Sequence, residues 1–296
     1  GGVVMRYNIA IIGGGPAGLS AAITVASKGH SVVLFEAHGF SPRLRSVEKI
    51  TDYMGIPDIS GNELIDRFVL HAEHAGAVIV PEKIVQLKER GGYFELGTPN
   101  GKYEADAVIL ATGVSRSNLL PGEQEFLGRG VSYCAKLDAL AYRNKRVAAI
   151  ATVPDAIEEV EYLAQYCEEV FFLPRYENFV PPKGKNITVV TDAPLDITGT
   201  DRVTGLHTTG EFFSVQAVFM FRATDPLNSF LPSLQMRGRS VMVDDQGETS
   251  IEGVFAGGDC TGQPWQVIRA AGSAQKAAIS AINYLARRDD LIKTFG

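Results

Sequence analysis

The most constraining feature of the sequence is the run Gly13-Gly14-Gly15-Pro16-Ala17-Gly18, which separates two apolar segments. The segment before it, Tyr7 to Ile12, is mainly apolar and typical of a buried strand, and Pro16 to Ser27 carries small and apolar residues at helical spacing. Ser31 to Phe35 then predicts a second buried strand. Strand, turn, helix and strand within about thirty residues form one βαβ unit of a parallel, doubly wound sheet.

The glycine turn also predicts a ligand. Gly13 permits the tight turn, Gly15 lets a pyrophosphate approach the backbone, and Gly18 lets helix and strand pack closely. The N–H groups at the start of the following helix favour an anion. Glu36 lies about 20 residues further on, where a carboxylate can accept the hydroxyl protons of an adenosine ribose. We therefore predict a dinucleotide site that includes Gly13, Gly15, Pro16, Ala17, Gly18, Glu36 and the neighbouring Ala37.

The rest of the chain predicts one domain interrupted by another. Proline and glycine punctuate residues 41–62, which we expect to be a loop, and 115–129 and the region of Pro226 and Pro232 are expected crossovers. Expected helices cover 62–75, 155–167 and 266–285, and expected strands cover 77–80, 84–87, 93–96, 107–110, 147–150, 170–173, 186–190, 215–221 and 254–256. The predicted fold is α/β, with two Rossmann-like, doubly wound domains: 5–114 with 233–296, interrupted by a smaller insert over 115–232.

Composition narrows the function. The 28 basic and 34 acidic residues leave a net charge of −6, which argues against a nucleic-acid binder. No stretch approaches the roughly 18 apolar residues of a membrane span, so no membrane association is expected. Three cysteines, none at CxxC spacing, are too few for a disulfide framework and favour a reducing, cytoplasmic setting. We assign no metal ligands.

Two further segments carry a family resemblance. Ala105 to Gly113, ADAVILATG, and Thr249 to Asp259, TSIEGVFAGGD, are similar to the second and third FAD segments of flavoproteins with two dinucleotide-binding domains. With GRGVSYCA at 128–135, the chain resembles the low-molecular-weight thioredoxin reductases, a class II pyridine nucleotide-disulfide oxidoreductase family. The resemblance implies an FAD-dependent oxidoreductase and a homodimer, and it adds as flavin contacts Asp52, Ile84, Val85, Ala111, Thr112, Gly113, Gly258, Asp259, Gln266 and Val267.

The chain departs from this family at the redox-active dithiol. The family has CxxC-D, and here the matching residues are Cys134-Ala135-Lys136-Leu137-Asp138. Leu137 replaces the second cysteine, and a single thiol cannot complete a thiol–disulfide cycle. Cys134 is then either an unreactive remnant or a thiol that forms a mixed disulfide, and no catalytic residue can be named.

A second departure concerns the nicotinamide nucleotide. Where the family has GGGxSA, this chain has ATVPDA from Ala151 to Ala156. Thr152 and Val153 place side chains where a pyrophosphate would lie, Pro154 lacks an N–H, and Asp155 brings negative charge to the helix N-terminus. Arg175 is the single basic residue after the next strand, where NADPH users have a cluster. We expect an NADPH-domain-like insert without a working NADPH site.

Three functions remain open. The first is an FAD-dependent oxidoreductase that uses neither NADPH nor a CxxC dithiol and is reduced by a small electron-carrier protein such as ferredoxin or flavodoxin. The second is a flavin-binding redox sensor or scaffold without turnover. The third is an NAD(P)H-dependent ferredoxin or flavodoxin reductase-type flavoenzyme, against which the residues from Thr152 to Asp155 count.

Overall fold

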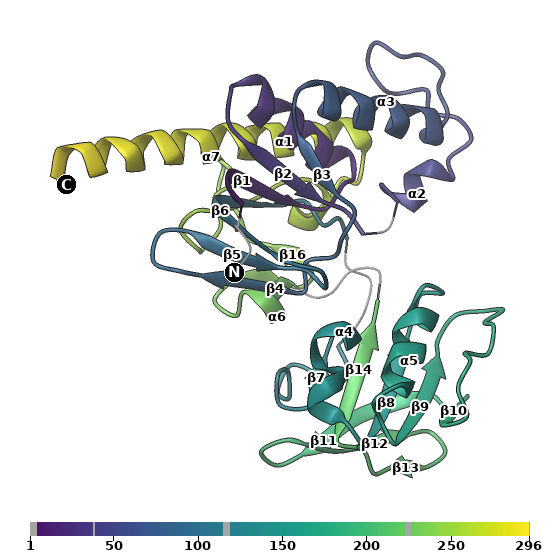
Figure 1. The fold of residues 1–296 in the computed structure, drawn as a ribbon. Coiled ribbons are helices and arrows are strands. Elements are labelled where there is room, and N and C mark those ends of the chain that lie inside the picture. The colour runs from purple at the N-terminus through teal and green to yellow at the C-terminus, as the bar shows by residue number, and fades with distance from the viewer. Residues whose placement is uncertain (1–4, 38, 115–118, 223–226, 296) are drawn as a thin grey trace. The chain divides into compact units, whose positions relative to one another are not determined.

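The protein consists of two compact units. The computed structural model describes residues 5–37, 39–114, 119–222 and 227–295 (Figure 1). The first unit comprises Gly1–Ser115 with Phe230–Gly296, and the second comprises Arg116–Ser229. The crossover residues 115–118 and Pro226 lie outside the described residues.

A mixed sheet forms the first unit, with strand order β3-β2-β1-β6-β5-β4 and with β17 paired to β6. Strands β1, β2, β3, β6 and β17 are parallel, whereas β4 and β5 pair antiparallel. The parallel strands therefore end at the same edge of the sheet. Their bounds are β1 Arg6–Ile12, β2 Val32–Phe35, β3 Val78–Val80, β4 Gln86–Glu89, β5 Phe94–Gly97, β6 Lys102–Leu110 and β17 Val254–Ala256, and a small hairpin is formed by β15 Met236–Arg237 and β16 Ser240–Val241.

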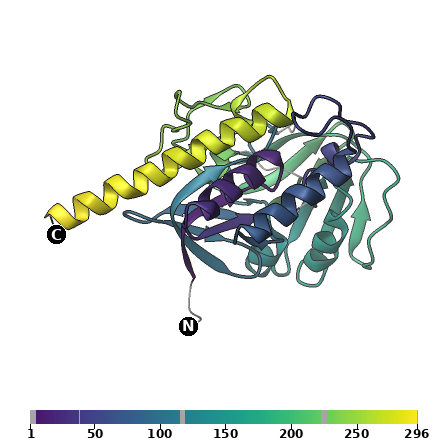
Figure 2. The ribbon, with the colours of Figure 1, turned by 90° about the horizontal axis from the view of Figure 1, so that it is seen from above.

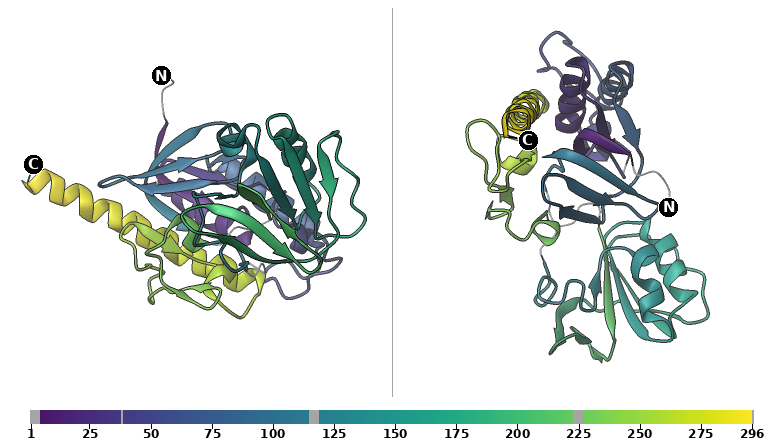
Figure 3. Two further views of the ribbon diagram at one scale, coloured as in Figure 1. Left: turned by 90° about the horizontal axis from the view of Figure 1, so that it is seen from below. Right: turned by 60° about the vertical axis from the view of Figure 1, so that its left-hand side comes forward.

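Three helices, α1 (Pro16–Ser27), α3 (Gly61–His74) and α7 (Val267–Phe295), lie side by side on one face of this sheet (Figures 2 and 3). Proline in the first turn favours the start of α1, and the Ser60 hydroxyl caps α3 by accepting from the Glu63 N–H at 3.1 Å. The facing residues of α1 and α7 are mostly alanines with no exposed surface, so the helices approach closely. Short elements of this unit are α2 Pro42–Arg45 and η2 Asp259–Thr261. Helix α6, Leu227–Phe230, spans the point in the sequence where the second unit ends and the first resumes.

The second unit is built on a parallel sheet of order β10-β9-β8-β14-β7. Helix α5 (Ala156–Ala164) buries Val160 and Leu163 against this sheet. The strands are β7 Val131–Ser132, β8 Arg146–Ala151, β9 Glu169–Pro174, β10 Ile187–Val189 and β14 Ala217–Phe221, and an antiparallel sheet adds β11 Pro194–Gly199, β12 Val203–Thr208 and β13 Phe212–Phe213. Two short helical segments precede β8, namely α4 Ala135–Asp138 and η1 Ala139–Tyr142.

A buried ion pair lies within the second unit. Glu123 has no exposed surface and Arg222 is 3% exposed. The guanidinium donates to both carboxylate oxygens at 2.5 and 2.6 Å, and the Tyr133 hydroxyl and the Leu120 N–H also donate to them at 3.0 Å each. Since a buried charge is costly unless it is paired and hydrogen-bonded, this arrangement ties the segment around Glu123 to the end of β14.

The sequence predictions are confirmed for the α/β class and wrong in several details. The expected loop 41–62 contains α2, and α3 begins at Gly61. Helix α5 is shorter than 155–167, whereas α7 continues ten residues past Leu285 because no glycine or proline follows to end it. Strand β6 begins at Lys102, since its first half pairs with β5, and the β11–β13 sheet was not predicted. Within the described residues, no helix combines the length and apolar character needed to cross a membrane.

Candidate functional site

The turn between β1 and α1 admits only glycine at two positions. Gly13 has φ +110°, and a Cβ there would lie 2.4 Å from the Ala111 carbonyl oxygen. A Cβ at Gly18 would lie 1.8 Å from the Gly13 carbonyl oxygen. Both approaches are far inside van der Waals contact, so strand, turn and helix pack at a distance that any side chain would prevent.

Gly15 leaves open space at the start of α1. It is the N-cap residue, and the Leu19 N–H donates to its carbonyl at 3.0 Å. A Cβ built at Gly15 would contact only Ser41 Cβ, at 3.9 Å. With Pro16 in the first turn, the N–H groups of Ala17 and Gly18 have no acceptor inside the helix. These N–H groups and the helix dipole suit an anionic group such as a phosphate.

The Glu36 carboxylate is held at this turn. Its Oε2 accepts the Gly14 N–H at 2.6 Å, and a Cβ at Gly14 would lie 2.7 Å from Glu36 Cβ. Gly14 was not among the predicted site residues, although its position inside the glycine run could have indicated it. Ala37 follows as an exposed residue. The structure thus brings Glu36 to the turn, as a ribose-binding carboxylate requires.

The ends of β6 and β17 meet the same turn. The Ala111 N–H donates to the Ile12 carbonyl at 2.9 Å, so Ala111, Thr112 and Gly113 follow directly beside β1. Gly258 donates its N–H to Ser273 Oγ at 2.8 Å, and a Cβ there would lie 2.5 Å from Ala17 Cβ. Residues from four distant parts of the sequence therefore converge at one edge of the sheet.

Asp259 carries an orphaned acceptor at this edge. Its Oδ1 is buried and has no hydrogen-bond partner among the described residues. Burial raises the pKa of the Asp259 carboxyl, while the positive charges of Arg269 and Arg43 oppose that rise. Arg269 itself donates to the Gly258 and Gly262 carbonyls at 3.0 and 2.8 Å. A buried acceptor of this kind fits a hydroxyl donor such as a ribityl chain.

The remaining predicted contacts lie in the first unit but are less closely tied to the turn. Ile84 is buried, and the Val85 N–H donates to the Gly97 carbonyl at 2.9 Å. Val267 packs against the buried cluster of Ile50, Ile59 and Leu64, whereas Asp52 and Gln266 are exposed. Their roles toward a flavin remain predictions.

Cys134 is the N-cap residue of the short helix α4 of the second unit, and Leu137 lies within that helix. Cys134 is 4% exposed, and burial, with a smaller contribution from the Glu159 charge, raises the pKa of its thiol to about 11. Glu159 Oε2 accepts the Ala135 N–H at 2.9 Å. Leu137 is 49% exposed. The structure therefore shows a buried thiol followed, three residues later, by an exposed alkyl side chain.

The turn between β8 and α5 differs in chemistry from the glycine turn. Val153 packs against the core of the second unit, and Asp155 caps α5 without a side-chain hydrogen bond. The Thr152 N–H is used, because it donates to the Phe221 carbonyl at 2.9 Å. Arg175 Nη1 donates to the carbonyls of Thr191 and Asp192 at 3.0 and 3.3 Å, so the guanidinium is engaged by the backbone.

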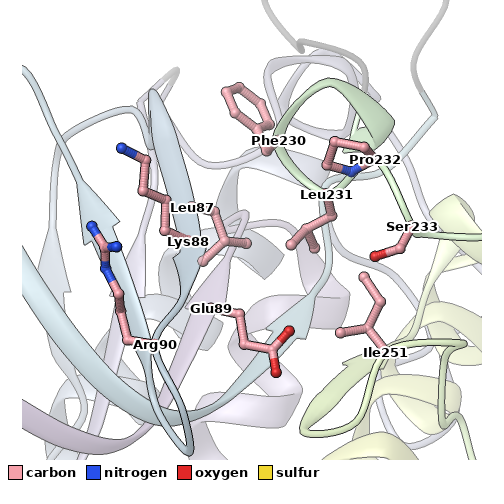
Figure 4. A pocket seen from close by; sticks show the side chains of 9 residues that line it. All are labelled: Leu87, Lys88, Glu89, Arg90, Phe230, Leu231, Pro232, Ser233 and Ile251. Carbon is pink, nitrogen blue, oxygen red and sulfur yellow. The ribbon is translucent and has the colours of Figure 1, made fainter.

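A pocket of about 300 Å³ lies elsewhere in the first unit (Figure 4). No predicted site residue lines it. Its walls come from three parts of the unit. These are β4 with the residue after it (Leu87, Lys88, Glu89 and Arg90), the last residue of α6 with the three that follow (Phe230, Leu231, Pro232 and Ser233), and Ile251, which precedes β17. Within the part of the chain that the structure describes, no group of three or more His, Cys, Asp or Glu residues could hold a metal ion.

Comparisons with known proteins agree with this geometry. The family model for pyridine nucleotide-disulphide oxidoreductases matches residues 7–278. Thioredoxin reductase of Aquifex aeolicus is 32% identical over 97% of this chain and 95% of its own length. A ferredoxin-flavin thioredoxin reductase from Clostridium acetobutylicum has a TM-score of 0.87 and 40% identity, covering 96% of this chain and 99% of that structure.

A third similar structure is the atypical thioredoxin reductase TRi from Desulfovibrio vulgaris Hildenborough, with a TM-score of 0.66 and 32% identity over 95% of this chain and 98% of that structure. These reductases bind FAD, which fits the glycine turn, Glu36 and the orphaned Asp259 oxygen described above. The chain belongs to the pyridine nucleotide-disulphide oxidoreductase family and is a thioredoxin reductase-like flavoprotein.

Proposed function

We propose that this protein is an FAD-dependent oxidoreductase that takes its electrons from a small carrier protein, ferredoxin or flavodoxin, and not from NADPH. In this proposal residues 5–114 with 233–296 hold FAD, and 115–232 form a degenerate NADPH-domain-like insert. FAD supplies the two-electron redox chemistry, and the chain supplies its binding, orientation and electrostatics.

The observation that carries the proposal is the turn between β8 and α5. A nicotinamide dinucleotide needs backbone N–H groups and open space at such a turn. Here the half-buried Val153 side chain packs against the core, Pro154 has no N–H, and Asp155 places negative charge at the helix N-terminus. The neighbouring Arg175 is already engaged by two carbonyls, which leaves it poorly placed to bind a 2′-phosphate. Each feature disfavours NADPH.

The absence of a second cysteine at position 137 supports a different exit for the electrons. A thiolate must attack and a partner thiol must resolve the mixed disulfide. Cys134 is buried with a pKa raised to about 11, so it is almost fully protonated near neutral pH. We propose that electrons leave without a dithiol relay, and that the acceptor is reduced at the flavin.

Two similar structures support the donor class. Both are ferredoxin-flavin thioredoxin reductases from Clostridium acetobutylicum, with TM-scores of 0.87 and 0.84. We carry over a ferredoxin-type donor from them, and from the thioredoxin reductase resemblance a homodimer. Three buried free cysteines are compatible with the reducing, cytoplasmic compartment where such carriers operate.

Anaerobic stopped-flow spectroscopy tests the proposal. The purified yellow protein is mixed with NADPH, NADH, reduced ferredoxin or reduced flavodoxin, and flavin absorbance near 450 nm is followed. We expect rapid bleaching by a reduced carrier and none by the nicotinamides, with an NADPH-dependent thioredoxin reductase as the positive control. Rapid bleaching by NADPH at sub-millimolar concentration would refute the donor assignment.

A flavin-binding redox sensor is a second candidate function, because the buried Cys134 and the exposed Leu137 are also compatible with a protein that does not turn over. The same sample distinguishes the enzyme from the sensor. Reduced protein is mixed with disulfide and other acceptors, and reoxidation is timed. Reoxidation in seconds by one acceptor supports turnover. Slow reoxidation by every acceptor, with a change in hydrodynamic radius on reduction, would indicate a redox sensor and contradict the proposed enzyme.

A further inference from the structure

A second buried carboxylate oxygen in the first unit lacks a partner. Glu82 follows β3 directly after Pro81, and its Oε2 is buried with no hydrogen-bond partner among the described residues. Such an oxygen is costly in a folded protein, because burial removes water that would donate to it. Buried acceptors of this kind are explained by a ligand or an ordered water that supplies the missing donor.

Glu82 lies beside Glu36, the carboxylate assigned to the ribose. The Glu36 N–H donates to the Val80 carbonyl at 3.1 Å, and the Glu82 N–H donates to the same oxygen at 2.8 Å. The backbone N–H groups of the two glutamates therefore share one carbonyl acceptor, at the carboxyl ends of the neighbouring strands β2 and β3. The strand order is β3-β2-β1, and the glycine turn follows β1. Glu82, after β3, and the glycine turn therefore lie on opposite sides of Glu36, which follows β2.

The order of groups in an adenosine diphosphate moiety matches this arrangement. With its phosphates against the start of α1 and its ribose at Glu36, the adenine at the far end of this moiety would extend past Glu36, on the side where β3 ends. The surroundings there are partly apolar: Ile84 is buried, and the rings of Phe35 and Tyr103 meet edge to face with centroids 4.9 Å apart. Glu82 is close enough to Tyr103 for its charge to act on that phenol.

The chemistry of the two partners is complementary. An ionised carboxylate is an acceptor only, whereas the exocyclic amino group of adenine is a donor only. We propose that Glu82 Oε2 accepts a hydrogen bond from the adenine amino group of FAD and so makes the site selective for adenine over a base with a carbonyl at that position.

The experiment compares two flavin dinucleotides on apoprotein. Quenching of flavin fluorescence gives the Kd of FAD and of flavin hypoxanthine dinucleotide, in which a carbonyl oxygen replaces the amino group. Wild-type protein is expected to prefer FAD by about tenfold or more, since the hypoxanthine oxygen would face the carboxylate without a donor. In Glu82→Ala this preference should fall to within about twofold.

Two variants guard the result. Glu82→Gln keeps an acceptor and adds an amide donor, so it should bind the hypoxanthine analogue better than wild type does. Glu73→Ala, at an exposed glutamate on α3, should keep the wild-type preference. Equal Kd values for the two dinucleotides in the wild type, or an undiminished preference for FAD in both Glu82 variants, would overturn the proposal. Because only binding is measured, the result does not depend on the electron donor.

Discussion

The glycine turn of the first unit and the turn between β8 and α5 of the second have the same framework and opposite chemistry. Each joins a parallel strand to a helix at the carboxyl edge of a sheet. At the first, a Cβ at Gly13 or Gly18 would collide with backbone, and the space over Gly15 is open. At the second, Val153 is half-buried and packs against the core, and Asp155 is the N-cap residue of α5.

The two turns differ although both units are doubly wound, so this framework does not by itself make a nucleotide-binding site. Strand order and parallel pairing are set by buried apolar residues, which both units have. Ligand capacity depends on a few positions where backbone N–H groups stay accessible and no side chain intrudes. The following predictions concern how each unit is held together and what each turn permits.

The largest expected effect concerns the buried ion pair of the second unit. Glu123→Gln removes the carboxylate charge that Arg222 contacts at 2.5 and 2.6 Å, and we expect the free energy of unfolding to fall by about 3–5 kcal/mol. Denaturant titration followed by circular dichroism measures this loss. The double variant Glu123→Leu with Arg222→Met should recover part of it, because no buried charge then remains, although the Tyr133 hydroxyl and the Leu120 N–H lose their acceptor. A loss below about 1 kcal/mol in the single variant would show that the pair contributes little.

The next effect falls on the glycine turn. Gly18→Ala places a methyl group 1.8 Å from the Gly13 carbonyl oxygen, and we expect it to cost about 1–3 kcal/mol of stability and to lower the flavin content after purification. Gly272→Ala is the matched control, since that glycine lies inside α7 with nothing within 4 Å of a built Cβ. It should raise stability by about 0.5–1 kcal/mol and retain flavin. Wild-type flavin content in Gly18→Ala would contradict the site.

A smaller effect is expected at the second turn. Asp155 is exposed at the N-terminus of α5, where its charge interacts favourably with the helix dipole. Asp155→Ser should therefore lower stability by about 0.3–1 kcal/mol, an effect that added salt reduces. NADPH should still fail to bleach the flavin, because Val153 and Pro154 remain. Bleaching by NADPH in this variant would show that the charge of Asp155 alone prevents NADPH from binding at this turn.

The smallest effect is expected for Cys134. With a thiol pKa of about 11, only about one molecule in a thousand is ionised at pH 8, so a disulfide reagent should react slowly and about tenfold faster per pH unit. Cys134→Ser should leave flavin reduction by the carrier protein within about twofold of wild type. Fast, stoichiometric labelling at pH 7, or a large loss of activity in Cys134→Ser, would make this thiol part of the mechanism.

The same thiol links stability to pH. Its folded pKa is raised above the unfolded value of about 8.5, so the unfolded chain loses a proton first as pH rises. The contribution of the buried Cys134 thiol to the free energy of unfolding is fully present below pH 8.5 and is lost progressively toward pH 11. Cys134→Ser should therefore flatten the alkaline limb of a plot of unfolding free energy against pH. An unchanged alkaline limb would show that burial of Cys134 does not depend on its protonation.

Much of the fold could be predicted because its signals are local. Continuous apolar runs identified β1, β2 and β17, and the glycine run with Pro16 fixed the start of α1. The misses are elements whose signal is not local. Strand β6 is extended by pairing with β5, and the β11–β13 sheet alternates too weakly to stand out, with only Ile197 of β11 fully buried. The short helix α2 was hidden among turn residues.

The candidate site was predictable where backbone geometry depends on residue identity. A side chain at Gly13 or Gly18 would collide with backbone, and Glu36 accepts the Gly14 N–H, so these residues identify the turn in the sequence. Gly14, the orphaned oxygen of Glu82 and the engagement of Arg175 were not predictable, because each depends on contacts between segments far apart in the sequence. Side-chain partners of that kind require the folded structure.

Equilibrium binding on one preparation shows whether the chain binds FAD and leaves the second unit without a nicotinamide nucleotide. Apoprotein is titrated with FAD by calorimetry, and the resulting holoprotein is then titrated with NADP⁺ and NADPH under anaerobic conditions. We predict one FAD per chain and no saturable binding of either nicotinamide nucleotide up to about 1 mM, a concentration that detects even weak sites. Saturable binding of NADPH at micromolar concentration, or apoprotein that takes up no FAD, would contradict this prediction.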